Sequence, residues 1–264
     1  MAEWTERAEL LFRKEGLEKL QNAHVLVVGL GGVGSFAAEF LARAGVGKMT
    51  IVDGDVVDIT NINRQLPALH STVGQPKITI VGDRLMDINP ELELIRVQEF
   101  LSPERAFEIV DPQFDYVLDC IDSITPKLNL IFGAKKKGVK IISNMGITPK
   151  LNLIFGAKKK GVKIISNMGA GGKMLASKVV VKDISKTEVC PLAKVVRKRL
   201  KKMGVNKGVK AVFSTEKPDE GSVKRTDGSN FKKSFYGTNS YMPGLFGLHA
   251  AETVVRYILK SDEK

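Results

Sequence analysis

The chain of 264 residues has few of the side chains that build disulfide frameworks and metal centres. It contains two cysteines, Cys120 and Cys190, and three histidines. Two cysteines cannot supply a disulfide framework, nor a zinc site made of two C-x-x-C pairs. A reducing compartment is the default for such a chain, and we therefore expect a cytoplasmic protein.

Long apolar runs are also absent. No stretch of the sequence approaches the ~18 consecutive apolar residues that a helix needs to cross a bilayer. The opening MAEWTERAEL mixes acids and bases and has no apolar core, which argues against a signal peptide. We expect no association with a membrane.

Acidic residues are outnumbered by basic ones. The chain has 41 lysines and arginines against 29 acidic residues, for a net charge of +12 and an isoelectric point of about 9.6. Such a balance suits a polyanionic partner, because basic side chains that neutralise phosphates release bound counterions. A solvated, lysine-rich surface would give the same composition, so the position of the charge has to decide.

What the sequence does contain is an alternation of apolar strands with amphipathic helices. Strands are predicted over 24–28, 48–53, 91–97 and 115–119, and helices over 34–43, 76–87 and 103–110. Strands separated by helices pair in parallel, which predicts an α/β fold with a doubly wound, mostly parallel sheet. Ligands of such sheets bind outside the carboxyl ends of the strands.

The pattern changes after residue 170. We predict a strand over 171–181, helices over 191–203 and 244–259, and a mobile loop over 217–233. The expected organisation is a nucleotide-binding domain over residues 1–182 and an appended C-terminal lobe over 183–264.

One segment occurs twice without a single change. Residues 124–146, ITPKLNLIFGAKKKGVKIISNMG, are repeated as residues 147–169, and each copy predicts one helix and one strand. Natural repeat arrays have roughly three or more units that differ from one another. We therefore interpret the second copy as a recent insertion, with only one helix–strand unit needed in the sheet.

The stretch VLVVGLGGVGS, residues 25–35, runs from an apolar strand into a glycine-rich turn. Gly29, Gly31 and Gly34 form the pattern G-x-G-x-x-G, in which backbone approaches phosphate and a following helix offers free N–H groups. Asp53 ends the next strand about 20 residues later and fits an acceptor for ribose hydroxyls. The pattern alone fits NAD as well as other nucleotides, and glycines used only for tight packing are the structural alternative.

The polar segment after the second strand favours ATP over NAD. The segment DGDVVDITNINRQ contains Asn61, Asn63, Arg64 and Gln65, and Lys77 follows near the start of the next helix. A dehydrogenase has no use for arginine and lysine beyond the pyrophosphate. An enzyme that splits ATP between its first two phosphates needs that charge to stabilise the leaving pyrophosphate. Surface side chains in a local turn would give the same spacing.

The segment VLDCIDS, residues 117–123, places Asp119 and Asp122 at the end of a predicted strand. Carboxylates at this edge suit the Mg²⁺ that accompanies ATP. Capping of the next helix by Asp122 or Ser123 is the structural alternative.

These motifs together resemble the ubiquitin-activating-like adenylating enzymes, which include the activators of bacterial sulfur-carrier proteins. The resemblance rests on G-x-G-G-x-G-S, D-x-D, N-x-N-R-Q, the downstream lysine and D-C-x-D-S. It implies a Rossmann-like ATP-binding fold over 1–182, adenylation of a carboxylate, a homodimer, and ATP with Mg²⁺ as ligands. The residues that it implies for ATP are Gly29, Gly31, Gly32, Gly34, Ser35, Asp53, Asp55, Asn61, Asn63 and Gln65.

The same resemblance implies catalytic and metal-binding roles. Arg64 and Lys77 would act at the phosphates, and Asp122 would hold magnesium. Arg7, in ERAELL, resembles an N-terminal arginine that reaches into the site of the partner subunit.

The C-terminal part resembles the family members that act on tRNA. The stretches DISKTEVCPLAKVVRKRL, AVFSTEKP and GTNSYMPGLFGLHAAETVVRYIL carry this likeness. Those members activate the threonyl carboxylate of a modified adenosine beside the anticodon, and the adenylate is lost on ring closure. The duplicated segment departs from the family pattern, and Cys190 stands where relatives can carry an acid, which argues against a required thiol there. The expected RNA-binding residues are Lys194, Arg197, Lys198, Arg199, Lys201 and Lys202.

Other functions stay open at this point. Adenylation of the C-terminal glycine of a ubiquitin-like sulfur carrier would use the same ATP motifs, although such activators commonly carry two C-x-x-C pairs. Sulfur-transfer proteins are accordingly candidate partners. An NAD-dependent oxidoreductase explains the glycines and Asp53 but leaves Arg64 and Lys77 without a role. A nucleotide-binding module without catalysis is the remaining alternative.

Overall fold

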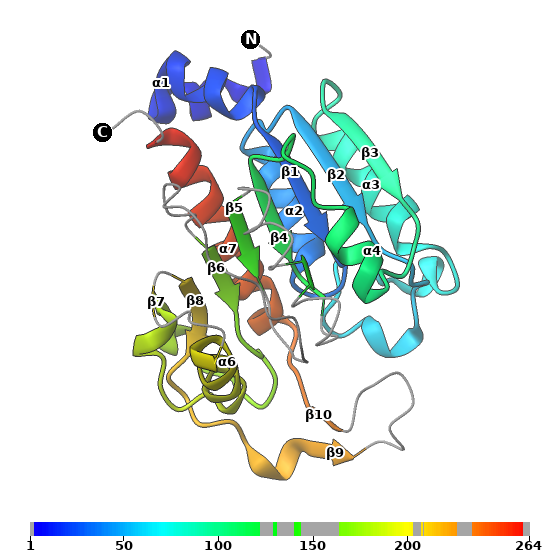
Figure 1. The fold of residues 1–264 in the computed structure, drawn as a ribbon. Coiled ribbons are helices and arrows are strands. Elements are labelled where there is room, and N and C mark those ends of the chain that lie inside the picture. Colours follow the sequence, from blue (N-terminus) through cyan, green and yellow to red (C-terminus); the bar gives the residue numbers. More distant parts are fainter. Residues whose placement is uncertain are drawn as a thin grey trace.

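The computed structural model describes residues 3–121, 129–130, 140–143, 164–202, 207, 209–225 and 234–260. Its core is an eight-stranded sheet in the order β3-β2-β1-β4-β5-β6-β8-β7 (Figure 1). All neighbouring strands are parallel except β7 and β8. This confirms the α/β prediction of a doubly wound, mostly parallel sheet. The strands are β1 (His24–Val28), β2 (Lys48–Val52), β3 (Glu93–Val97), β4 (Tyr116–Asp119), β5 (Lys140–Ser143), β6 (Ile164–Asn167), β7 (Val179–Asp183) and β8 (Val209–Ser214).

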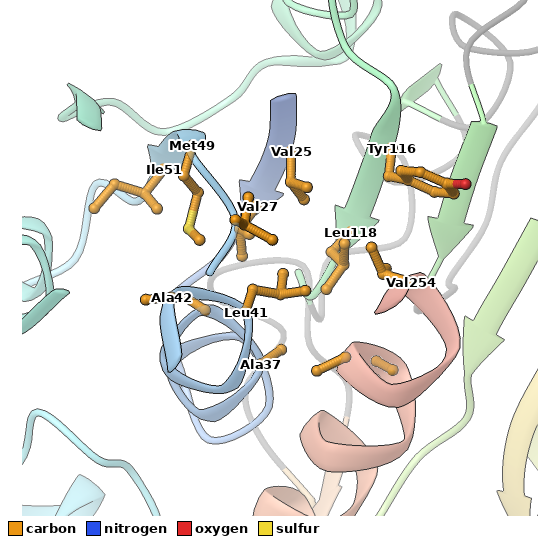
Figure 2. Packing of buried hydrophobic residues seen from close by; sticks show 14 of the residues in the cluster. Val25, Val27, Ala37, Leu41, Ala42, Met49, Ile51, Tyr116, Leu118 and Val254 are labelled. Atoms are coloured by element: carbon orange, nitrogen blue, oxygen red, sulfur yellow. The ribbon is translucent and has the colours of Figure 1, made fainter. Parts of the chain in front are cut away.

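Two hydrophobic cores flank the sheet, so every residue of β1 is buried. Val25 and Val27 contribute to the core that the helices α2, α3 and α7 cover, and Figure 2 shows this packing. Leu26 and Val28 point to the opposite face, toward α4 and α6. The helices of the main body are α1 (Glu6–Gln21), α2 (Gly34–Arg43), α3 (Lys77–Ile88), α4 (Pro103–Glu108), α6 (Pro191–Lys202) and α7 (Tyr241–Leu259).

The helix α7 runs along one face of the sheet, from the carboxyl ends of the strands to their amino ends. Its first turn places Pro243 against Gly32, in the loop that follows β1. Its last turn brings Leu259 against Gly16 of α1, at the edge where β1 begins (Figure 1). The carboxyl edge of the strands therefore carries the glycine loop, and the opposite edge carries α1.

The C-terminal lobe is attached to the same sheet. The strand β8 pairs with β6, so the main sheet includes strands from both sides of residue 182. The division into two domains at residue 182 stays a prediction. The strand predicted over 171–181 begins only at Val179, and β8 itself was not predicted. Part of the expected loop over 217–233 is ordered as β9 (Val223–Arg225), which pairs with β10 (Ser234–Tyr236), while residues 226–233 lie outside the described part.

Both copies of the repeat contribute a strand, which differs from the expectation that one unit would suffice. The first copy supplies β5, which pairs with β4, and the second supplies β6, which pairs with β8. Ile142 pairs with Ile165, and these residues occupy equivalent positions in the two copies. The extra strand can pair on both sides because a parallel strand offers evenly spaced backbone hydrogen bonds to each neighbour. Apart from residues 129 and 130, the predicted helices of the repeat lie outside the described residues.

Within the part of the chain that the structure describes, none of the helices is both long and apolar enough to cross a membrane.

Candidate functional site

The turn after β1 is shaped by close backbone contacts. Gly29 has a positive φ of 89°, and a Cβ atom there would lie 3.0 Å from the carbonyl carbon of Cys120. A Cβ on Gly34 would lie 1.8 Å from the carbonyl oxygen of Gly29. The hydroxyl of Ser35 donates to the carbonyl of Gly31 at 2.6 Å. Gly29, Gly34 and Ser35 thus form the turn itself.

Gly31 has more room than its neighbours. A Cβ there would meet only the Gln65 side chain, at an ordinary contact distance of 3.7 Å. Packing within the described chain does not require a glycine at this position, so an approaching ligand is the better reason for it. Gly32 differs, because a Cβ would lie 3.0 Å from Pro243 and 3.1 Å from the carbonyl oxygen of Arg64.

Asp53 links this turn to the next strand. Its two carboxylate oxygens accept hydrogen bonds from the backbone N–H of Leu30, at 2.6 Å, and of Asp55, at 2.7 Å. Burial raises the pKa of Asp53, while these two hydrogen bonds act to lower it. Each oxygen keeps a second lone pair, so the carboxylate fits the predicted acceptor for ribose hydroxyls.

Lys77 carries a buried positive charge at the start of α3. Its Nζ lies 3.0 Å from Oδ2 of Asp55, and only 5% of the lysine side chain is exposed, against 54% for the aspartate. Lys77 is also close enough to Asp53 to lower the pKa of that carboxyl. The three predicted residues therefore lie together at the carboxyl edge of β2.

Arg64 lies beside the glycine turn and is held by local contacts. Its Nη1 donates to the carbonyl of Thr60 and to Oδ1 of Asn63, both at 2.9 Å. Asn61 shapes the same crossover, since its Oδ1 accepts from the backbone N–H of Asp58 at 3.4 Å. The backbone of Arg64 thus lies next to Gly32, while its guanidinium is held within the crossover.

Gln65 supports the presence of a ligand beside this turn. Its Oε1 is buried and has no hydrogen-bond partner among the described residues, while its amide group lies next to Gly31. A buried acceptor without a donor is costly, and a bound hydroxyl or amino group would satisfy it. The residues at this edge therefore fit a nucleotide.

One predicted residue lies away from this edge, and another is not among the described residues. Arg7 is exposed on α1, at the opposite end of the sheet. Asp122 lies outside the described residues, and no group of three or more His, Cys, Asp or Glu side chains that could hold a metal occurs among those that are described.

The predicted RNA-binding helix α6 divides into two sets of side chains. Lys194, Lys198 and Lys201 are exposed, at helical spacings of four and three residues. Arg197 instead donates to the carbonyl and the hydroxyl of Thr187 and fastens the helix to the preceding turn. Arg199 is half-buried, and the side chain of Lys202 lies outside the described residues.

The sequence analysis missed the contribution of the segment before α7. Asn63 donates from Nδ2 to the carbonyl of Thr238 at 2.8 Å, and Pro243 contacts Gly32. A Cβ on Gly247 would lie 2.5 Å from the carbonyl oxygen of Val33, so α7 needs this glycine to pack on α2. The G-x-x-G spacing of Gly244 and Gly247 was the available signal for this approach.

A glycine turn at the end of β1, an acidic residue after β2 and a buried lysine at the start of α3 lie at the carboxyl ends of the strands, which is where nucleotides bind in sheets of this kind. The chain belongs to the ThiF family, whose model matches residues 6–264. This confirms the resemblance expected from the sequence.

Similarity to one kind of member extends over nearly the whole chain. The tRNA threonylcarbamoyladenosine dehydratase of Bacillus subtilis is 41% identical over 264 residues, which cover 97% of this chain and 95% of that protein. The crystal structure of the E. coli enzyme TcdA in complex with ATP is 31% identical, with a TM-score of 0.77, and covers 97% of this chain and 94% of that one. The E. coli molybdopterin-synthase adenylyltransferase is 37% identical, but over only 52% of this chain.

Proposed function

We propose that this protein is an ATP-dependent tRNA threonylcarbamoyladenosine dehydratase. It would adenylate the threonyl carboxylate of the modified adenosine and release the adenylate when the ring closes. The observation that carries the proposal is a glycine turn with room for a ligand at Gly31, which contacts the backbone of Arg64 and is bonded to Asp53, the neighbour of Lys77. The similarity to dehydratases along nearly the whole chain supports the substrate.

The site residues have distinct tasks in this proposal. ATP, when bound, supplies the adenylyl group that makes the carboxylate oxygen a good leaving group. The open backbone at Gly31 and the amino-terminal end of α2 receive phosphate, and Asp53 accepts from the ribose. Arg64 and Lys77 stabilise the negative charge that develops as pyrophosphate departs. Asp122 is the proposed ligand of Mg²⁺.

The proposed tRNA surface lies on the C-terminal lobe. Lys194, Lys198 and Lys201 form one exposed stripe on α6, and Lys224 and Arg225 are exposed on β9. These five cations account for part of the excess positive charge and suit the phosphates of RNA. Arg197 contributes through the position of the helix, since Thr187 already accepts its hydrogen bonds.

A homodimer explains the position of Arg7. This side chain is exposed at the edge of the sheet opposite the glycine turn, so it cannot serve the site of its own subunit without crossing the sheet. We propose that it enters the site of a partner subunit. The division at residue 182 and a cytoplasmic location complete the proposal.

Activation of a sulfur-carrier protein is the second candidate. The similarity to molybdopterin-synthase adenylyltransferase favours it, but this similarity spans only about half of the chain. It leaves the basic lobe without a function, while sulfur-transfer proteins remain proposed partners.

One experiment separates these candidates. The purified chain is incubated with ATP and Mg²⁺ and with tRNA that carries threonylcarbamoyladenosine, with a ubiquitin-like carrier, or with neither. We expect AMP and pyrophosphate to form only with the tRNA. Mass spectrometry should then show that the modified nucleoside has lost the mass of one water. Turnover with the carrier alone would overturn the proposal. Binding of NAD as tight as that of ATP would contradict the nucleotide assignment.

A further inference from the structure

Asn63 occupies a position between the nucleotide site and the C-terminal lobe. Its Oδ1 accepts from Arg64 Nη1 at 2.9 Å, and its Nδ2 donates to the carbonyl of Thr238 at 2.8 Å. The other side-chain contact of Arg64 is to Thr60, four residues away. The side chain of Asn63 therefore joins Arg64 to a part of the chain 175 residues distant.

The segment that receives this bond is itself fastened on two sides. Asn239 accepts from the backbone N–H of Met242 at 2.9 Å and so caps α7, and it donates to the carbonyl of Lys173 at 3.0 Å. The N–H of Gly237 donates to the carbonyl of Ser222 at 2.8 Å, and its carbonyl accepts from Gly172 at 2.7 Å. These bonds fix the position of the Thr238 carbonyl. A shift of the segment would therefore move the side chain of Asn63 and, through it, that of Arg64.

The same segment continues directly from the basic hairpin. The strand β10 ends at Tyr236, one residue before Gly237, and pairs with β9, on which Lys224 and Arg225 are exposed. A polyanion bound by these cations would hold the paired strands β9 and β10 in one position. Asn63 supplies the side-chain hydrogen bond that ties the crossover at 58–65 to the segment at 237–240.

We propose that Asn63 is a positioning residue that couples the binding of RNA on the hairpin to the orientation of Arg64. RNA would hold the hairpin and the segment at 237–240 in place, and Asn63 would then fix the guanidinium that meets the phosphates. This inference rests on the proposed function. It gives Asn63 a role different from the direct contact with ATP that the sequence analysis expected.

The test measures the coupling between two ligands rather than the rate of the reaction. The dissociation constant of an α,β-methylene analogue of ATP is determined by calorimetry with and without saturating unmodified tRNA, which carries no reactive carboxylate. We expect tRNA to tighten binding of the analogue about fivefold or more in the wild type, the lower end of ordinary coupling. In Asn63→Ala the factor should fall to about one.

Two variants separate the two hydrogen bonds of this side chain. Asn63→Asp keeps an acceptor for Arg64 and lacks the donor toward Thr238, so we expect it to lose the coupling as well. Asn63→Gln keeps both groups on a longer side chain and should restore part of it. Asn22→Asp makes the same chemical change at an exposed asparagine at the other edge of the sheet, and should leave the coupling unchanged.

The outcomes distinguish this inference from the proposed function. Wild-type protein that binds neither the analogue nor tRNA would overturn both. Wild-type protein that binds both without coupling would overturn only the inference. Retention of the full coupling factor in Asn63→Ala, with its thermal midpoint unchanged, would also overturn it.

Discussion

Lys77 and Asp55 form an ion pair of unequal exposure, with Nζ 3.0 Å from Oδ2 and the lysine buried beneath the more exposed carboxylate. Asp55 holds the ammonium at the carboxyl edge of the sheet, where phosphates are expected. The ammonium has three N–H donors and gives one of them to Asp55, so others are left for a ligand. The side chain of Lys77 is therefore already in position before a ligand arrives.

Replacement of the cations should affect chemistry more than binding. Lys77→Ala and Arg64→Ala remove charge that matters most when pyrophosphate leaves, so we expect turnover to fall at least about a hundredfold, or ~2.7 kcal/mol. The dissociation constant of ATP should change much less. Steady-state kinetics and calorimetry on the same preparations check this, with Lys14→Ala on α1 as a matched control. Full turnover in either variant would remove its assigned role.

The Arg7 prediction depends on two subunits. Arg7→Ala subunits mixed with Asp122→Ala subunits should recover part of the activity, because one site in each mixed dimer keeps both side chains. Refolded mixtures are compared with each variant alone in the dehydration assay. No recovery, in a preparation shown by light scattering to be dimeric, would contradict an arginine supplied by the partner.

Stability in acid should depend on Glu39. Its carboxylate accepts from Arg84 Nε at 2.6 Å and from Arg43 Nε at 2.9 Å, which joins α2 to α3. Burial acts to raise the pKa of Glu39, but these arginines outweigh it, and the pKa lies below its ordinary value of 4.5. The stabilisation is thus complete above pH ~4.5 and is lost as the pH falls through the lower, folded-state value.

Glu39→Gln should accordingly cost about 2 kcal/mol in free energy of unfolding at pH 7. The difference from the wild type should shrink as the pH is lowered below ~4.5, because the wild-type carboxylate then becomes protonated. Urea unfolding at a series of pH values measures it. A difference that stays constant between pH 7 and pH 3 would contradict the ionic origin of the effect.

Lys173 offers a different test of stability. It is 3% exposed, its Nζ donates to the carbonyl of Gly169 at 2.9 Å, and the neighbouring Cys190 acts to raise its pKa. Burial lowers the pKa of Lys173, since a thiol is a weak partner for an ammonium. Cys190→Asp supplies a carboxylate to a cation that is already buried, and we expect a gain of about 1 kcal/mol, or ~2–4 °C in Tm. Cys190→Ser is the control, and a lower Tm for Cys190→Asp than for Cys190→Ser would contradict the ion pair.

The repeat leads to a prediction by deletion. Removing residues 147–169 leaves one copy of the repeat. Its single strand has the sequence of both β5 and β6, so it can pair with β4 on one side and with β8 on the other. We expect the shortened chain to fold, to be more soluble, and to keep or increase its activity. Circular dichroism, sedimentation and the dehydration assay test this. An unfolded product or loss of nucleotide binding would mean that both copies are needed.

Local features of the sequence predicted the first half of the fold well. The strand at 24–28 and the helix at 34–43 have the predicted bounds, because a fully buried strand and a glycine turn leave little choice. The topology of parallel strands was enough to bring Asp53 and Lys77 together. The strand predicted over 171–181 was wrong in its first part, where Glu216 and Asn239 hold the backbone of residues 173–175. Such contacts between distant segments, like that of Asn63 with Thr238, leave no local pattern.

The pairing of Ile142 with Ile165 shows how the fold accommodates a duplicated segment. An in-frame tandem copy of this segment widens the sheet by one strand spacing, about 4.8 Å, and leaves the partners of β4 and β8 chemically unchanged. A copy added or removed in this way changes the width of the sheet and leaves the order of the surrounding strands as it is.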